Sequence, residues 1–310
     1  MMDFNGFQEE IADQILEYLP DVYCRATVRL FYMDSLNGSY NALQIVGGGD
    51  GHCPAVNLDR CYEQFVQGTS IEDILTNIAD IVAGVRRAVD IEAMRCYEDA
   101  SKKLFFRVSS VVRNLEFLKK VPHRIVEDLV FTYHVAVELE KGEFGSGVVT
   151  NEVMEMYGVT EDELYYDAMQ SCANVLGVAV KPLNQILFEG PAPFDDCGAS
   201  ESIRVVTSRV MRYGASILFC PGMMHRIAKE MQSGFFIIPS SVHELMLIPS
   251  DDPSEYERFD AIVHSVNSSC LSDKNTLSDH VYYYDDEYGI FARADHFVQL
   301  MEETEEMMHK

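Results

Sequence analysis

The sequence has few basic residues for its length. Its 310 residues include 24 Lys and Arg against 50 Asp and Glu, which gives a formal net charge of −26 at pH 7. A chain of this charge repels phosphate groups, so non-specific binding to nucleic acid or to an anionic membrane surface is unfavourable. We therefore expect neither direct nucleic-acid binding nor membrane association.

Long apolar runs are also missing. No run approaches the roughly 18 residues that a membrane span requires. The first 20 residues lack the cationic start and the apolar core of a signal peptide, and they have the pattern of an amphipathic helix. The eight cysteines never form a CxxC pair, and most have apolar neighbours, as reduced thiols in a core do. These features predict a cytoplasmic protein without disulfides.

Motifs of the common metal and cofactor sites are absent as well. The sequence has no HExxH, no paired CxxC and no DxDxG calcium loop, so we expect no metal site and no cofactor. The glycine-rich run at residues 47–51 lacks the GK[ST] ending of a phosphate loop. The segment around Ser146 lacks the GxSxG spacing of a nucleophile elbow. We interpret the first as a loop and assign no role to the second.

The chain does contain enough apolar material for a large core. Hydrophobic residues make up 47% of it, and a chain of this length can form one large domain or two ordinary ones. We expect a single domain over residues 1–310, with two possible lobes, about 1–188 and 203–310, joined by the polar loop 189–202.

Local patterns predict strands and helices interleaved along the chain. Residues 24–33 and 39–46 are rich in β-formers and flank Asn37-Gly38, which favours a tight turn and therefore a hairpin. Ser70 and Thr160 each stand three residues before an acidic residue, the spacing of a capping box at a helix start.

The last third predicts a strand pair over residues 202–219, a helix over 220–231 and strands over 235–249, with Pro239 to Ser241 as a turn. The elements do not follow a strict strand–helix–strand rhythm. We therefore expect an α+β fold, with mixed or antiparallel sheets and interleaved helices, rather than a doubly wound sheet.

Basic residues gather in one stretch, residues 101–124, where Glu116 is the only acidic residue. Such a run is usually a solvated surface that offsets acidic excess, and the alternative is a docking site for an acidic ligand or partner. The candidate binding residues are Lys102, Lys103, Arg107, Arg113, Lys119, Lys120 and Arg124.

Three polar segments stand out against apolar surroundings: VPHRIVEDL, PSSVHEL and LSDHVYYYDD. On a continuous strand, His243 and Glu244 point to opposite faces and cannot share one pocket without a bulge. The simplest interpretation of His243 is a core histidine satisfied by a backbone carbonyl or a carboxylate, and the alternative is a ligand-binding or catalytic role. The candidate catalytic residues are His123, Asp128, His243, Glu244, Asp279 and His280.

Several segments together resemble one protein family, the domain-of-unknown-function family 5688. They are PAVNLDRCYEQFVQG, NLEFLKKVPHRIVEDL, VVTNEVMEMYGVTEDELYYDAMQ, YGASILFCPGMMHRIAKEM, FFIIPSSVHELMLIP and VNSSCLSDKNTLSDHVYYYD. The resemblance covers about residues 25–285. The family has no established activity. The resemblance implies an uncharacterised bacterial α+β domain and no particular reaction.

Three functions remain open. The lack of a catalytic motif and the tyrosine-rich segment VYYYDDEY favour a non-enzymatic binding or regulatory protein that recognises a protein partner or a small ligand. The second function is a hydrolase, metal-dependent or acid/base, in which the fold brings His, Asp and Glu side chains together. The third is an acidic inhibitor that mimics nucleic acid.

Overall fold

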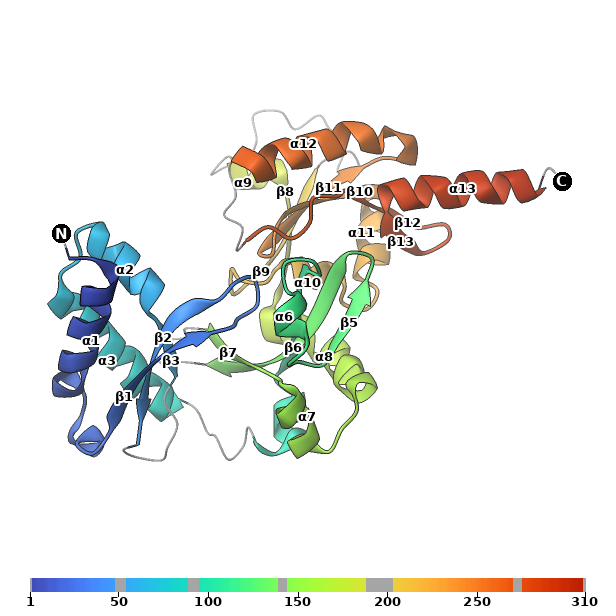
Figure 1. The fold of residues 1–310 in the computed structure, drawn as a ribbon. Helices are drawn as coiled ribbons and strands as arrows, with labels where there is room; N and C mark the ends of the chain where they lie inside the picture. The colour runs from blue at the N-terminus through green and yellow to red at the C-terminus, as the bar shows by residue number, and fades with distance from the viewer. Residues whose placement is uncertain are drawn as a thin grey trace. The chain divides into compact units, whose positions relative to one another are not determined.

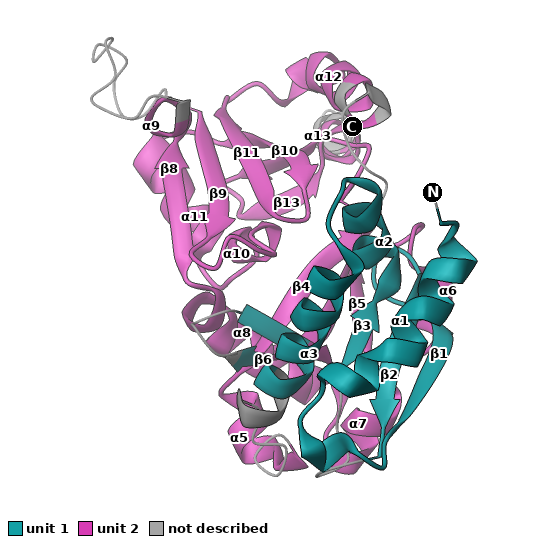
Figure 2. Ribbon diagram, turned by 90° about the vertical axis from the view of Figure 1, so that its left-hand side faces the viewer, with its two compact units in different colours: residues 1–94, 137–146 teal, residues 95–136, 147–310 magenta. Residues whose placement is uncertain are grey.

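The computed structural model describes residues 2–47, 54–88, 95–138, 144–187, 203–269 and 275–308. Within these ranges, helices alternate with the strands of three antiparallel sheets, so the expected α+β class is confirmed. The chain folds into two compact units (Figure 2): unit 1 is residues 1–94 and 137–146, and unit 2 is residues 95–136 and 147–310. The loop 189–202, expected to join two lobes, lies outside the described residues.

Unit 1 combines a three-stranded sheet with helices. The helices are α1 (Phe4–Tyr18), α2 (Leu58–Val66) and α3 (Ile71–Ala88), with a 3-10 turn at Asp21–Tyr23, and the strands are β1 (Thr27–Met33), β2 (Tyr40–Val46) and β3 (Ala55–Asn57). Strands β1 and β2 pair antiparallel, which confirms the expected hairpin. In its turn, φ is 64° at Asn37 and 129° at Gly38. These are the residue types that tolerate a positive φ at the least cost.

The core of unit 1 follows the helical period. Phe7, Ile11 and Ile15 recur every four residues along α1 and are fully buried against a stripe of apolar residues on α3. The expected capping box at the start of α3 is confirmed, because the Ser70 hydroxyl accepts the N–H of Asp73 at 3.1 Å and donates to its carboxylate at 2.6 Å.

Unit 2 contains a six-stranded sheet in the order β13-β12-β10-β11-β9-β8. Its strands are β8 (Val178–Pro182), β9 (Arg204–Ser208), β10 (Phe235–Ser241), β11 (Glu244–Pro249), β12 (Tyr282–Asp285) and β13 (Ile290–Arg293). The remaining sheet has β6 (Leu129–Glu138) between β4 (Leu104–Ser110) and β5 (His123–Val126), and β7 (Phe144–Val148) also pairs with β6.

Helices pack on these sheets (Figure 1). Helices α12 (Tyr256–Ser269) and α13 (Ala294–Met308) cover one face of the six-stranded sheet through an apolar cluster that includes Phe236, Val263, Tyr283 and Phe297. Helix α8 (Glu161–Leu176) packs on β4 and starts with the expected capping box of Thr160 and Glu163. The other helices are α5 (Tyr97–Ser101), α6 (Leu115–Leu118), α7 (Asn151–Tyr157), α9 (Leu183–Leu187), α10 (Ala215–Leu218) and α11 (Met223–Met231), with a 3-10 turn at Pro253–Glu255.

The strand pair expected over residues 202–219 is wrong in its second half. Only β9 is a strand, and the chain then turns into the short helix α10. Positive φ angles of 55° at Met211 and 57° at Tyr213 interrupt the extended backbone. At Gly214, a Cβ atom would lie 2.3 Å from the carbonyl oxygen of His243. The loop between β9 and α10 is therefore pressed against a neighbouring turn instead of running beside β9.

The turn expected at Pro239 to Ser241 is also misplaced. These residues belong to β10, whose pairing with β11 shifts register between Ile238 and Ser241. The chain reverses at Val242 and His243, and Glu244 begins β11. His243 is thus a turn residue, so the expectation that it and Glu244 occupy opposite faces of one continuous strand is wrong.

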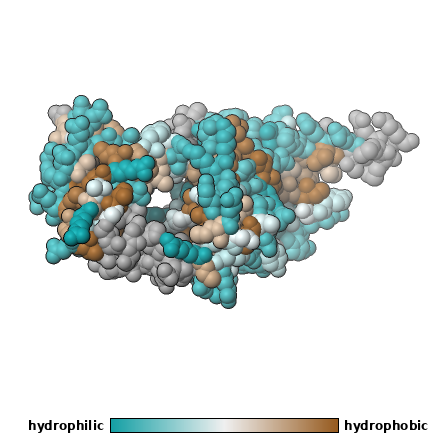
Figure 3. Space-filling view, turned by 60° about the horizontal axis from the view of Figure 1, so that its bottom comes forward, coloured by the Kyte–Doolittle hydropathy of each residue, from teal (hydrophilic) through white to brown (hydrophobic). Residues whose placement is uncertain are grey.

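The surface mixes polar and apolar residues. On the face drawn in Figure 3, apolar residues form separate patches between hydrophilic ones, as is ordinary for globular proteins. Among the described helices, none combines the length and the apolar character needed to cross a membrane.

Candidate functional site

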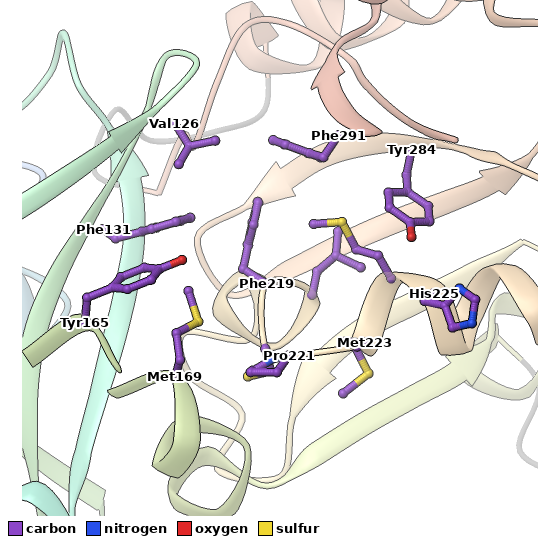
Figure 4. Close-up of a pocket in the computed structure, with 14 residues that line it drawn as sticks. Val126, Phe131, Tyr165, Met169, Phe219, Pro221, Met223, His225, Tyr284 and Phe291 are labelled. Carbon is purple, nitrogen blue, oxygen red and sulfur yellow. The ribbon is translucent and has the colours of Figure 1, made fainter. Parts of the chain in front are cut away.

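An apolar pocket with a volume of about 330 Å³ lies within unit 2 (Figure 4). Val126 and Phe131 of the β5–β6 hairpin line it, as do Tyr165 and Met169 of α8. Its other walls are residues 218–225, which run from the end of α10 into the first turn of α11, together with Tyr284 of β12 and Phe291 of β13. The volume falls in the lower part of the range of small-molecule sites, about 300–1,000 Å³.

Aromatic rings build one wall of the pocket. Phe219 makes edge-on contacts with Phe131 and Phe291, with ring centroids 5.1 Å and 5.2 Å apart. Tyr282 stacks on the other side of this group, 5.3 Å from Phe291. Each such pair stabilises by about 0.5–1.5 kcal/mol beyond its buried area. The wall is therefore held by ring-to-ring contacts between two sheets and the segment after α10.

Sulfur atoms supply much of the remaining lining. Met169, Met223, Met224 and Cys220 all face the pocket, and thioethers adapt to ligands of irregular shape. Cys220 lies against Cys172 of α8, and burial together with this neighbouring thiol raises the pKa of Cys172 well above its ordinary value. A thiol held protonated in this way is a poor nucleophile.

Two tyrosine hydroxyls are the polar features that Figure 4 shows directed toward the pocket, one from Tyr165 and one from Tyr284. The ring of Tyr165 carries the guanidinium of Arg124 at 3.9 Å from its centroid. Burial, assisted by the Asp286 carboxylate, raises the pKa of Tyr284. Tyr284 can therefore present a neutral O–H group to a ligand.

Charged groups beside the pocket are engaged with one another. Arg124 pairs with Glu161 at 2.7 Å and with Asp162 at 2.5 Å. At the α11 end, Nδ1 of His225 lies 2.6 Å from a carboxylate oxygen of Asp286. The same carboxylate pairs with the ammonium of Lys229 at 3.3 Å. Each of these side chains beside the pocket therefore already has a partner in the protein.

The turn of the β5–β6 hairpin is tied to β12. The carboxylate of Asp128 accepts hydrogen bonds from the Ser278 hydroxyl at 2.7 Å and from the Tyr282 hydroxyl at 2.6 Å. Val126 lines the pocket two residues before Asp128, and Tyr282 stacks on Phe291 of the lining. The hydrogen bonds of Asp128 to Ser278 and Tyr282, called the tie below, therefore fix the β5–β6 wall of the pocket relative to the β12–β13 wall.

The fold thus brings together two of the three polar segments noted in the sequence. Beside the tie, Asp279 accepts the side-chain N–H of Asn267 at 2.7 Å and lies 3.9 Å from Arg113. Nδ1 of His280 lies 4.0 Å from Asp260. The candidates Asp128, Asp279 and His280 thus share one neighbourhood, in which each has a protein partner.

The other three candidate catalytic residues are placed separately. Nδ1 of the partly buried His243 accepts the backbone N–H of Tyr213 at 3.2 Å, a donor rather than the expected carbonyl or carboxylate. Nδ1 of His123 lies 2.9 Å from the carbonyl oxygen of Val121. Glu244 is exposed at the start of β11. Catalytic roles for these residues stay predictions.

The basic stretch is largely compensated by nearby acids. Lys102 pairs with Asp99, and Lys119 pairs with Glu116, both at the surface. Arg113 and Arg124 pair with the carboxylates given above. Lys103 and Lys120 are exposed. Arg107 is different, because it is partly buried and forms no ion pair with a described residue.

Sequence reasoning missed the residues that form the pocket. Phe219, Met169 and Tyr284 are apolar or aromatic, and in sequence they cannot be told from ordinary core residues. The one available signal was the paired methionine after a Pro-Gly in CPGMMHRI, an unusual start for a helix. In the described ranges, no group of three or more His, Cys, Asp or Glu side chains could hold a metal ion.

Comparison with known proteins places most of the chain in one family. A family model described as "Family of unknown function (DUF5688)" matches residues 4–286. The match confirms the resemblance seen in the sequence segments and extends it toward the N-terminus. A search of curated proteins and a search of solved structures each found no match.

Proposed function

The chain belongs to this family of unknown function, and we propose that it is a non-enzymatic binding protein whose ligand is a compact, uncharged aromatic alcohol. The observation that carries the proposal is the pocket of about 330 Å³ in unit 2, with its lining of aromatic rings and sulfur atoms. Concave apolar sites with a few convergent polar groups are the usual form of a small-molecule site.

The lining supports an aromatic ligand. Phe131, Phe219 and Phe291 offer ring edges and faces to an incoming ring. Thioether sulfurs such as that of Met169 make favourable contacts with aromatic edges. The hydroxyl of Tyr165 or Tyr284 can hydrogen-bond the hydroxyl of the ligand. A charged ligand is disfavoured, because the nearby ionised groups are already paired with one another.

The same neighbourhood supports binding over catalysis. Asp128, Asp279 and His280, the candidates of the hydrolase alternative, contact structural partners rather than the pocket lining. The pocket thiol lies beside Cys172, whose raised pKa disfavours a thiolate. We also propose a cytoplasmic location, which the free thiols of Cys172 and Cys220 support because they stand together unlinked. The net charge of −26 supports the absence of direct nucleic-acid binding.

The test uses the absence of tryptophan from the chain, since a single introduced indole then reports alone. Tyr165→Trp places the indole in the pocket lining, and Tyr166→Trp, at an adjacent side chain that is 64% exposed, is the matched control. The probe is 6-bromo-2-naphthol, whose heavy atom quenches indole fluorescence on contact.

We expect saturable quenching of the Tyr165→Trp protein and only weak, linear quenching of the Tyr166→Trp protein. Unsubstituted 2-naphthol should compete for the site and restore the fluorescence. Isothermal titration of the unsubstituted protein with 2-naphthol should give one site per chain. Equal, non-saturating quenching of both variants would refute the proposal, as would titration heat no larger than that of dilution.

A further inference from the structure

A second cluster of polar residues lies on one face of the β4–β6–β5 sheet. In the strand register, Arg107 pairs with Thr132, and Thr132 pairs with His123. Paired residues project to the same face, so these side chains form a row across three strands. The adjacent row pairs Phe105 with His134. Ser109 is two residues from Arg107 along β4 and therefore shares this face.

The position of Arg107 is set by a rigid frame. Its guanidinium carbon lies 4.1 Å from the centroid of the Tyr213 ring. Tyr213 in turn stacks on Phe105, at 5.8 Å between ring centroids, and its backbone N–H is bonded to His243. Because Gly214 allows the loop to approach His243 closely, this aromatic platform cannot move away from the sheet without breaking those contacts.

Arg107 lacks the compensation that the rest of the basic stretch has. None of the five N–H donors of its guanidinium bonds to a described residue, and no described carboxylate pairs with it. Arg124 is the instructive comparison, since it also stacks on a tyrosine yet binds both Glu161 and Asp162. A cation in a partly buried site without a counter-charge is strongly unfavourable.

The neighbours of Arg107 do not supply a negative charge. His134 is buried, and burial followed by the positive charge of Arg107 lowers its pKa well below the ordinary value, so it is neutral at pH 7. Burial likewise lowers the pKa of Arg107. The Ser109 hydroxyl is buried and has no hydrogen-bond partner among the described residues. The guanidinium of Arg107 and the hydroxyl of Ser109 are therefore two donor groups on the same sheet face that have no acceptor among the described residues.

We propose that this sheet face binds a small monocarboxylate, whose two oxygens accept N–H donors of Arg107. The planar guanidinium fork matches a carboxylate in a two-point contact. The Ser109 hydroxyl is a further potential donor on the same face, whereas the Thr132 hydroxyl already lies 3.1 Å from Nε2 of His134. One guanidinium balances one negative charge, whereas a phosphate dianion would add a net negative charge to a chain that already carries −26. Arg107 and His123 are only partly buried, so solvent reaches the row.

The first experiment follows the side-chain Nε–Hε resonance of Arg107 by NMR in the full-length protein, with the assignment made from its loss in Arg107→Lys. Sodium acetate and sodium benzoate are the probes, and sodium chloride and sodium phosphate at matched ionic strength are the comparisons. We expect a saturable shift with either carboxylate and none with chloride. Stronger binding of phosphate would overturn the carboxylate assignment, and a resonance that no anion moves would overturn the site.

The second experiment compares thermal unfolding of two neutral variants. Arg107→Met removes a charge that has no counter-ion in chloride buffer, so its melting temperature should equal or exceed that of the unsubstituted protein. It should also lose the stabilisation that acetate gives. Arg124→Met, the matched control, breaks an existing ion pair and should melt lower while keeping the acetate response. The proposal would be wrong if, in chloride buffer, the melting temperature fell as far for Arg107→Met as for Arg124→Met. Such a result would show that the protein itself already compensates the charge of Arg107.

A third variant distinguishes a two-point contact with the guanidinium from general electrostatic attraction to a positive charge. Arg107→Lys keeps the charge but removes the planar fork, and it should weaken acetate binding by about tenfold or more. Unchanged acetate affinity in this variant would show that the contact is a general electrostatic one, and the proposed two-point site would be wrong.

Discussion

The hydroxyl of Tyr282 donates a 2.6 Å hydrogen bond to the carboxylate of Asp128, which lies 154 residues earlier in the chain. The hydroxyl of Ser278 donates to the other oxygen of the same carboxylate. Burial, followed by the charge of Asp128, raises the pKa of Tyr282 well above its ordinary value, so the phenol stays a donor. These bonds join the β5–β6 turn to β12 of the six-stranded sheet.

Tyr282→Phe should therefore lower the free energy of unfolding by about 1.5–3 kcal/mol, the usual range for a hydrogen bond to a charged group. The ring and its stacking on Phe291 are retained, so the loss isolates the hydroxyl. Urea denaturation measures it. Tyr288→Phe, at a side chain that is 62% exposed, is the control and should change stability by less than about 0.5 kcal/mol. Equal small effects in both variants would mean that the tie contributes little.

Gly214→Ala should be more damaging than an ordinary glycine substitution. Its Cβ would meet the carbonyl oxygen of His243 at 2.3 Å and the Cα of Thr207 at 2.5 Å, both rigid backbone atoms. We expect a loss of about 1–3 kcal/mol or more from overpacking. Gly158→Ala, where φ is +68° but nothing lies within 4 Å of the added atom, should cost only about 1 kcal/mol. Circular dichroism melts rank the two, and the reverse ranking would contradict this packing.

His134 should make the protein less stable in mild acid. Its pKa is lowered in the folded state by burial and by Arg107, so below pH 6.5 the unfolded chain takes up a proton that the folded chain refuses. Stability is therefore complete above the unfolded-state pKa of 6.5 and falls as pH drops below it, by up to about 1.4 kcal/mol per pH unit for one proton. Urea midpoints between pH 5 and pH 8 should show this slope, and His134→Gln should flatten it. An unchanged slope in the variant would assign the effect to other groups.

Phe219→Leu should weaken the pocket wall and widen the pocket. The substitution removes edge-on contacts with Phe131 and Phe291, and two such pairs stabilise by about 1–3 kcal/mol together. Differential scanning calorimetry gives the loss. If the aromatic wall also sets ligand size, the variant should favour 2-anthrol over 2-naphthol relative to the unsubstituted protein. An unaltered preference would remove Phe219 from the recognition surface.

Local features of the fold could be predicted because their causes are local. The Asn37-Gly38 turn and the capping boxes of Ser70 and Thr160 depend on residues a few positions apart. The turn at His243 and the helix after Gly214 could not, since the approach of β9 to a distant turn decides both. The same β-rich composition that predicts a strand over residues 202–219 fits a buried helical turn equally well.

The candidate site was partly visible in the sequence for a similar reason. Polar side chains in apolar runs indicate candidate sites, so the sequence points to Asp128 and the 278–280 segment, and the structure joins them through the hydrogen bond from Ser278 to Asp128. They hold walls of the pocket, however, and the lining itself is apolar. The packing of segments far apart in sequence decides which apolar residues face a cavity. The hydrophobic periodicity of a single helix or strand does not contain this information.

The long reach from Asp128 to Tyr282 has a consequence for synthesis on the ribosome. The β4–β6–β5 sheet is made early, but the hydroxyl that anchors its turn is added 154 residues later. Until β12 emerges, the carboxylate of Asp128 and the rings of Phe131 and Phe219 have only part of their final surroundings. Contacts of such high sequence separation slow folding and leave apolar surface open to chaperones and to aggregation. Nascent chains that end before Tyr282 should therefore be protease-sensitive in unit 2, and protection should arise late, when β12 and β13 complete the sheet.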